Sequence, residues 1–258
     1  MNPFIRIVNS KFKKFGYRVS KIEKANLDHQ FIGVSKFEKK TLEICSNYSM
    51  TGYENMFALI KSIDFISKNN VKGDFVECGV WKGGNLILFQ KMIEKFKLKK
   101  KIYAFDTYEG MTAPQKVDQT FLGESSIAIF EKLKRKKIDP KKNTVMAECS
   151  IEDVKNNFRK NTNNNKNLIC IKGPVEKTLQ IKKNLPKKIS ILRLDTDWYQ
   201  STKIELIKLF PLVEKKGIII IDDYGYWKGA RKAVDEYFKN KNLTMFKIDF
   251  TGRLIIKI

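Results

Sequence analysis

Acidic side chains follow two apolar runs in the C-terminal half of the chain. Leu192-Arg-Leu-Asp195 and Ile218-Ile-Ile-Ile-Asp222-Asp223 are rich in leucine or isoleucine until carboxylates end them. Such runs are typical of strands that are buried on both faces of a parallel sheet. Their carboxyl ends would bring the acids to one rim, where open α/β sheets bind ligands. A turn or helix cap made by the Asp-Asp pair is the structural alternative.

Three carboxylates at one rim repel one another and attract a divalent cation. Oxygen ligands without a nearby His or Cys suit magnesium better than zinc. The pattern therefore predicts a Mg²⁺ site made by Asp195, Asp222 and Asp223, in which Asp197 matters less. His29, the only histidine, lies far from these acids in the sequence. Its position leaves the role of general base to a carboxylate such as Asp195.

A glycine-rich turn and another acid-ended strand favour a nucleoside cofactor. Glu77-Cys-Gly79 leads into a turn and a helix, and the next strand ends at Asp106. Gly79 lets the backbone approach a ligand, and Asp106 can accept hydrogen bonds from ribose hydroxyls. The turn has neither GxGxxG nor GK[ST], so a pyrophosphate or P-loop site is not supported. S-adenosylmethionine, a sulfonium with a ribose and no phosphate, fits Glu77 and Asp106. Purely structural roles for the turn and for Asp106 are the alternative.

Strands and helices must alternate to position these residues. The pattern predicts a doubly wound, mostly parallel α/β sheet, with a basic, helical N-terminal extension or lid over 1–50 and one domain over 51–258. The tail has no room for a crossover helix and predicts an antiparallel hairpin of 243–249 and 253–258. The other predicted strands are 74–78, 101–106, 143–148, 168–172, 189–195 and 217–222, and the predicted helices are 53–69, 84–97, 123–136, 151–159, 174–183, 199–214 and 228–240.

Short motifs along the chain carry a resemblance to a known family. They are Gly73-Asp-Phe-Val-Glu-Cys-Gly-Val-Trp-Lys-Gly-Gly, Phe105-Asp-Thr-Tyr-Glu-Gly-Met, Cys170-Ile-Lys-Gly173, Leu194-Asp-Thr-Asp-Trp-Tyr-Gln-Ser-Thr202, Asp222-Asp-Tyr-Gly225 and Gly229-Ala-Arg-Lys-Ala-Val-Asp-Glu-Tyr-Phe238. Together they resemble the macrocin O-methyltransferase (TylF-type) family of S-adenosylmethionine-dependent class I methyltransferases. Residues 178–180, Thr-Leu-Gln, depart from the family's usual Thr-Leu-Pro.

The resemblance implies a fold, a reaction and roles for particular residues. The fold is a Rossmann-like, seven-stranded sheet with one antiparallel strand, and the reaction is magnesium-dependent methylation of sugar hydroxyls. By position, Asp195, Asp222 and Asp223 resemble the metal ligands, and Asp195 also resembles the proposed base. Glu77, Gly79 and Asp106 resemble the cofactor site, and Ser150 resembles a residue near the adenine. The acceptor would be a glycan, a nucleotide sugar or a glycosylated natural product.

Four residues that flank the glycine turn in the sequence are candidates for the mouth of the site. They are Tyr48, Met50, Tyr53 and Trp81. Sugars lie well on aromatic faces, so these side chains could contact an acceptor. Packing in the core or in a lid is the alternative.

The net charge of +23, from 51 Lys and Arg against 28 Asp and Glu, permits two interpretations. It could attract nucleic acid, anionic lipid or a nucleotide-linked substrate, or it could reflect biased composition. The lysines are dispersed along the chain, which favours biased amino-acid composition over a nucleic-acid groove. Peripheral contact with an anionic surface stays open, as does self-association. An RNA methyltransferase and a non-catalytic binding protein on the same fold remain alternatives. No apolar run approaches the ~20 residues of a membrane span, and no secretion signal is evident, so a cytoplasmic protein is expected.

Overall fold

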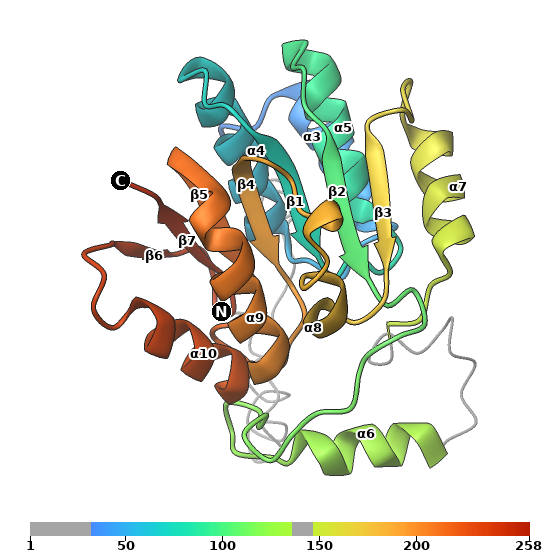
Figure 1. Ribbon diagram of the computed structural model, residues 1–258. Coiled ribbons are helices and arrows are strands. Elements are labelled where there is room, and N and C mark those ends of the chain that lie inside the picture. The colour runs from blue at the N-terminus through green and yellow to red at the C-terminus, as the bar shows by residue number, and fades with distance from the viewer. Residues whose placement is uncertain (1–31, 136–146) are drawn as a thin grey trace, which may run out of the picture. The chain divides into compact units, whose positions relative to one another are not determined.

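Residues 40–258 form a seven-stranded mixed sheet with helices on both faces (Figure 1), in a computed structural model that describes residues 32–135 and 147–258. The strand order is β3-β2-β1-β4-β5-β7-β6. The first five strands in this order are parallel, and β7 runs antiparallel to β5 and to β6. The strands are β1 (Asp74–Cys78), β2 (Ile102–Asp106), β3 (Leu168–Lys172), β4 (Ile189–Leu194), β5 (Val213–Ile221), β6 (Met245–Lys247) and β7 (Arg253–Ile256).

Two helical layers cover the sheet. Helices α4 and α5 lie behind it in the view of Figure 1, and α8, α9 and α10 lie in front. The buried faces are those expected from helical spacing, as in α4, where Met56, Leu59, Ile60 and Ile63 are buried. The helices are α3 (Lys36–Ser46), α4 (Tyr53–Lys68), α5 (Gly84–Phe96), α6 (Ser126–Arg135), α7 (Ile151–Asn161), α8 (Val175–Thr178), α9 (Tyr199–Leu209) and α10 (Lys228–Phe238).

The sheet confirms the predicted fold class. Strands 74–78 and 168–172 have the predicted boundaries, and the C-terminal hairpin forms as expected. The predicted strand over 143–148 is wrong for 147 and 148, which lie in a turn and an irregular segment, and its other four residues lie outside the described part of the chain. Strand β5 begins four residues before the predicted 217. Its early part passes Lys216 at a φ of 64°, where the pairing with β4 is irregular.

Two predicted helices end early for local reasons. The helix predicted over 199–214 ends at Leu209 and continues as a 3₁₀ turn, Phe210–Leu212, because Pro211 lacks the backbone N–H that an α-helix needs. The helix predicted over 174–183 is a single turn, α8. The side chain of Asn184 donates to the carbonyl of Thr178 at 3.0 Å and satisfies a group that further helix would otherwise have used.

The N-terminal residues belong to a second unit, Met1–Lys39. In its described part, Ser35 and Glu38 form a reciprocal capping box: the Glu38 carboxylate accepts from Ser35 N at 2.8 Å, and Ser35 Oγ accepts from Glu38 N at 3.3 Å. This capping box agrees with the expected helical character of the extension. The division at residue 50 stays a prediction, and His29 lies outside the described residues.

Candidate active site

A cleft opens at the carboxyl ends of the five parallel strands. Its empty volume, open mouth included, is about 1060 Å³. Each parallel strand supplies lining residues at or just after its end. These are Gly79 after β1, Asp106 on β2, Gly173 after β3, Asp195 after β4 and Asp222 after β5. The predicted rim of the sheet is therefore the wall of one cleft.

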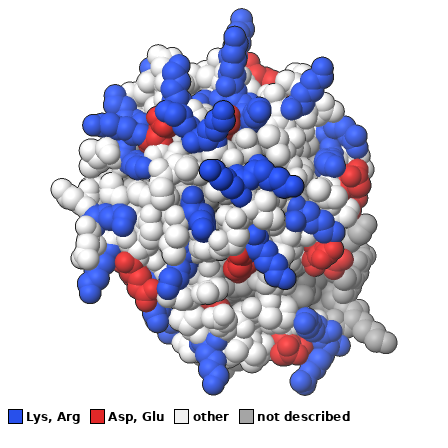
Figure 2. All heavy atoms as spheres, viewed as in Figure 1, with Lys and Arg blue, Asp and Glu red and all other residues white. Residues whose placement is uncertain are grey.

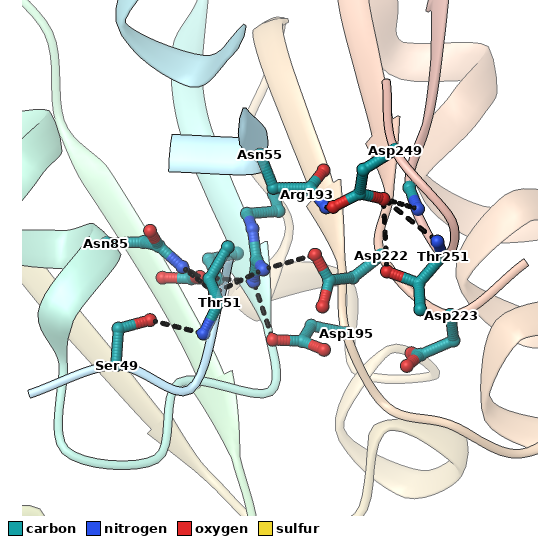
Figure 3. A network of polar contacts seen from close by, with 12 residues as sticks. Ser49, Thr51, Asn55, Asn85, Arg193, Asp195, Asp222, Asp223, Asp249 and Thr251 are labelled. Carbon is teal, nitrogen blue, oxygen red and sulfur yellow. Dashed lines mark hydrogen bonds and ion pairs between the residues drawn. The ribbon is translucent and has the colours of Figure 1, made fainter. Parts of the chain in front are cut away.

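Arg193 lies beneath the floor of this cleft and holds three carboxylates (Figure 3). Its Nη1 donates to Glu77 Oε1 at 2.8 Å and to Asp195 Oδ2 at 2.7 Å. Its Nη2 forms an ion pair with Asp222 Oδ1 at 2.8 Å that lacks hydrogen-bond geometry, and donates to Thr51 Oγ1 at 2.8 Å. The guanidinium is only 1% exposed, so it acts as a permanent internal counter-charge.

Asp195, Asp197 and Asp223 converge on one point. Each offers a carboxylate oxygen, and these atoms all lie within 4.8 Å of one another, as a shared cation would require. Asp223 Oδ2 also accepts from Asp197 N at 3.0 Å. Asp197 has a φ of 65°, a left-handed conformation that is uncommon outside glycine and is found at functional turns. The geometric cluster thus includes Asp197, whereas the sequence had favoured Asp222; Asp222 as a ligand stays a prediction.

Burial makes these acids reluctant to ionise. It raises the pKa of Glu77 to about 7 and that of Asp197 to about 6. For Asp222 and Asp223, burial and then the neighbouring aspartates hold the pKa well above its usual range. Burial lowers the pKa of Arg193, but Asp195, Asp222 and Glu77 raise it more, so Arg193 stays charged. One guanidinium cannot compensate all of these acids, and a bound cation would.

Residue 79 must be glycine for a structural reason, in addition to its position at the cleft. Its φ is +80°, and a Cβ at this residue would overlap the backbone carbonyl of Asp195. Glycine therefore allows the ends of β1 and β4 to approach each other closely, which brings Asp195 into the cleft. The ligand that sequence reasoning placed near Gly79 would lie on the cleft side of this contact.

Asp106 is built into the glycine turn by backbone hydrogen bonds. Its Oδ2 accepts from Val80 N at 2.7 Å and from Trp81 N at 3.2 Å, and its Oδ1 accepts from Tyr108 N at 2.7 Å. The carboxylate lines the cleft, and its Oδ1 also accepts from Thr107 Oγ1 at 3.3 Å. Its oxygens therefore already have four protein donors, and a ribose hydroxyl would share an oxygen with one of them. The turn-forming alternative is thus present in the structure, and cofactor binding by Asp106 stays a prediction beside it.

Ser150 lies on an exposed helix end. It caps α7, accepting from Asp153 N at 3.1 Å, and it does not line the described cleft. Of the four candidates for the mouth, Met50 and Trp81 line the cleft, and Tyr48 and Tyr53 do not. A role for Ser150 near the adenine stays a prediction.

Sequence reasoning missed several residues of the site. Arg193 was passed over inside a buried strand, although a single charge in such a run requires a partner. Thr51 and Asn85 fasten the same network, with Asn85 Nδ2 donating to Thr51 Oγ1 at 3.0 Å and to Glu77 Oε1 at 3.1 Å. The segment after β3, Gly173 to Glu176, also lines the cleft. Only its glycine could have indicated from the sequence that it belongs to the site.

The charge of the cleft is opposite to that of the protein. Lys and Arg are dispersed among acids over the face in Figure 2. Among the described residues that line the cleft, none is Lys or Arg and seven are acidic. The seven are Glu77, Asp106, Glu176, Asp195, Asp197, Asp222 and Asp223. Such a lining attracts cations and repels phosphates. In the part of the chain that the structure describes, no helix is long and apolar enough to cross a membrane.

Comparisons with known proteins agree with the geometry. The sequence model of the macrocin-O-methyltransferase (TylF) family matches residues 38–256. Demethyldecarbamoylnovobiocin O-methyltransferase of Streptomyces niveus is 29% identical over 192 residues, which are 74% of this chain and 67% of that protein. A tetracenomycin-C 4'-O-methyltransferase of Streptomyces olivaceus, whose full name specifies a 2,3-dimethoxy-α-L-rhamnosyl group, is 27% identical over 209 residues, covering 80% and 74% of the two chains.

Solved structures show the same relationship. The structure of the O-methyltransferase NovP is similar with a TM-score of 0.67 and 27% identity, covering 81% of this chain and 82% of that one. The calicheamicin methyltransferase CalS11 shares the fold at a TM-score of 0.54 and 15% identity, over 99% and 93% of the two chains.

Proposed function

The chain belongs to the macrocin O-methyltransferase (TylF) family and is an S-adenosylmethionine-dependent O-methyltransferase, and from this premise we propose that it methylates a sugar hydroxyl with the help of a divalent cation. Curated relatives named for methylation of glycosylated natural products support a sugar acceptor. A free glycan and a nucleotide sugar present the same hydroxyl chemistry, so the proposal extends to both.

The observation that supports a bound cation is the convergence of Asp195, Asp197 and Asp223 in the cleft. Carboxylate oxygens alone suit Mg²⁺, which keeps some of its water ligands and could exchange them for sugar hydroxyls. A cation there would stabilise the alkoxide that forms when a poorly acidic sugar hydroxyl loses its proton. Asp222, which contacts Arg193, would be a further acid able to bind the cation if the cluster rearranged on loading.

The cleft also fits the cofactor. Glu77 and Asn85 line it, and Glu77 Oε2 and Asn85 Oδ1 are buried without a hydrogen-bond partner among the described residues, as groups that pair with a bound ligand would be. The acidic lining suits the sulfonium and the amine of S-adenosylmethionine, which supplies the methyl group. Asp106 lies at the end of β2, where it can hold the ribose hydroxyls.

The protein residues have distinct tasks in the transfer. Asp195 lines the cleft and belongs to the acid cluster, its Oδ2 is held by Arg193, and its carboxylate would take the acceptor proton. Trp198 bounds the acceptor side, fixed by a hydrogen bond of 2.9 Å from its Nε1 to the carbonyl of Thr112. Holding acceptor oxygen and methyl carbon in line supplies much of the remaining acceleration.

The proposal is tested by methyl transfer from radiolabelled S-adenosylmethionine to a panel of TDP-sugars, rhamnosylated natural products, cell-surface glycans and total RNA. Label in a sugar O-methyl group, lost in excess EDTA and restored by Mg²⁺, is the expected result. Label in RNA would replace the proposal with the nucleic-acid alternative, which the acidic lining of the cleft disfavours. Full activity in EDTA would remove the cation from the mechanism and leave the sugar acceptor in place.

A further inference from the structure

A short strap, residues 48–51, crosses the N-terminus of α5 and borders the cleft. The carbonyl of Tyr48 accepts from Gly84 N at 3.0 Å, and a Cβ at residue 84 would lie 2.6 Å from the Cβ of Ser49. Ser49, Met50 and Thr51 all line the cleft. The strap is therefore seated directly over the turn that the cofactor must approach.

Thr51 fastens this strap to the sheet and to α5. Its Oγ1 accepts from Arg193 Nη2 at 2.8 Å and from Asn85 Nδ2 at 3.0 Å. Asn85 in turn donates to Glu77, and Arg193 donates to Glu77 and Asp195. Figure 3 shows Thr51 between Asn85 and the guanidinium, with Asp195 and Asp222 on the other side of the guanidinium. A single hydroxyl thus ends a polar network that begins at the acid cluster.

Arg193 is shared between the strap and the acids. One guanidinium nitrogen, Nη1, serves Glu77 and Asp195; the other, Nη2, serves Asp222 and Thr51. The group is planar and rigid, so it cannot change its hold on Asp195 without moving relative to Thr51. Asp195 is also a member of the candidate cation cluster.

We propose that Arg193 and Thr51 couple the divalent-cation site to the cofactor cleft, so that each ligand strengthens the binding of the other. The inference rests on the proposed function in one respect, that a cation binds at the Asp195 cluster. A cation held by this cluster would draw on the Asp195 carboxylate, which Arg193 also holds. Arg193 would then be left with Glu77, Asp222 and Thr51, and its contact with Thr51 would hold the strap in place. Linkage requires the reciprocal effect, in which a closed strap favours the cation.

The test is calorimetric titration with S-adenosylhomocysteine, with and without Mg²⁺. This product lacks the sulfonium charge, so direct repulsion between the two ligands is small and no turnover occurs. In the wild-type protein Mg²⁺ should lower the dissociation constant about tenfold, within the range usual for coupled sites. Thr51→Val keeps the shape of the side chain but not the hydroxyl. It should reduce the ratio of the dissociation constants without and with Mg²⁺ to about one. Thr51→Ser, which keeps the hydroxyl, should restore it.

Further variants make the result specific. Thr244→Val repeats the substitution at an exposed residue outside the cleft and should keep the wild-type ratio. Arg193→Lys keeps the charge but cannot contact the acids and Thr51 through two separate nitrogens, so it should also abolish the coupling. Melting curves would show that each protein used is folded, and Arg193→Lys replaces Thr51→Val if the latter is not.

Separate titration with Mg²⁺ alone distinguishes the failures. If wild-type protein binds Mg²⁺ and S-adenosylhomocysteine independently, the coupling is overturned and the cation site stands. A coupling that persists in both Thr51→Val and Arg193→Lys would overturn the assignment to these residues. If Mg²⁺ does not bind at all, both the coupling and the cation part of the proposed function are overturned, while the methyltransferase assignment is untouched.

Discussion

Arg193 lies directly opposite Glu77 in the pairing of β4 with β1, and its Nη1 is 2.8 Å from Glu77 Oε1. Each side chain is only 1% exposed. Removing one member of a buried ion pair leaves the other as an uncompensated charge, which is costly. Arg193→Gln should therefore lower the free energy of unfolding by about 3–5 kcal/mol, measured by urea denaturation above pH 7, where Glu77 is ionised.

A surface pair provides the control for this prediction. Lys188 and Glu214 approach to 2.9 Å, but their side chains are 58% and 30% exposed. Lys188→Gln should change the free energy of unfolding by no more than about 1 kcal/mol. Equal effects of the two substitutions would mean that burial does not govern the Arg193 network.

The raised pKa of Glu77 predicts how stability changes with pH. Burial raises this pKa from 4.5 to about 7, so the folded protein keeps a proton that the unfolded chain has released in this window. The free energy of unfolding should therefore fall as the pH rises from about 4.5 to 7, by roughly 1–3 kcal/mol for this group. Urea denaturation in EDTA at several pH values measures the slope. Glu77→Gln should flatten it, and a wild-type slope that the variant keeps would contradict the pKa.

The sequence predicted the sheet well because its strands are buried on both faces. Apolar runs such as 189–194 can form little else, and an acid at a strand end marks the rim. It also placed Asp195, Asp222 and Asp223 correctly on the cleft. The cleft itself follows from the strand order, which the spacing of residues alone does not encode.

What the sequence could not give were contacts between distant segments. Thr51 is 142 residues from Arg193, and nothing in either neighbourhood announces the hydrogen bond between them. The choice between Asp197 and Asp222 is equally non-local. It depends on a left-handed backbone at Asp197 and on the position of a guanidinium from within the strand. Of the strand predicted over 143–148, the two described residues, 147 and 148, lie outside the sheet.

Gly79 should be intolerant of a side chain. Gly79→Ala places a Cβ against the Asp195 carbonyl and also strains a φ of +80°, so it should cost more than about 3 kcal/mol and abolish cofactor binding. Gly123→Ala is the matched variant, because Gly123 has a φ of +88° but its nearest heavy atom is the flexible Lys228 Nζ at 3.4 Å. It should cost only the conformational strain, about 1–2 kcal/mol. Urea denaturation and S-adenosylhomocysteine titration measure both, and similar losses would show that φ alone matters.

Asp118 should fix the loop that follows the cleft-lining residues 110–112. Its Oδ1 accepts from Tyr199 N and its Oδ2 from Gln115 N, both at 2.7 Å, and its side chain is buried. Asp118→Ala leaves two backbone donors without an acceptor, so a loss of about 2–4 kcal/mol is expected. Hydrogen exchange at Gln115 and Tyr199 should rise. Asp118→Asn keeps one acceptor oxygen, so its stability and hydrogen exchange should lie between those of the wild type and Asp118→Ala. Unchanged exchange in both variants would exclude the anchoring role.

The last prediction decides between Asp197 and Asp222 as the third cation ligand. The oxygen of Asp197 lies with those of Asp195 and Asp223, whereas Asp222 faces Arg193. Asp197→Asn should therefore weaken Mg²⁺ binding, measured by calorimetry, tenfold or more, about 1.4 kcal/mol. Asp222→Asn should weaken it less, because its main loss is a partner of Arg193. Asp195→Asn should lose both Mg²⁺ binding and turnover while keeping S-adenosylhomocysteine affinity largely through Asp106. If Asp222→Asn proves the more damaging of the first two, the cluster must rearrange when the cation binds, and Asp222 takes the place of Asp197.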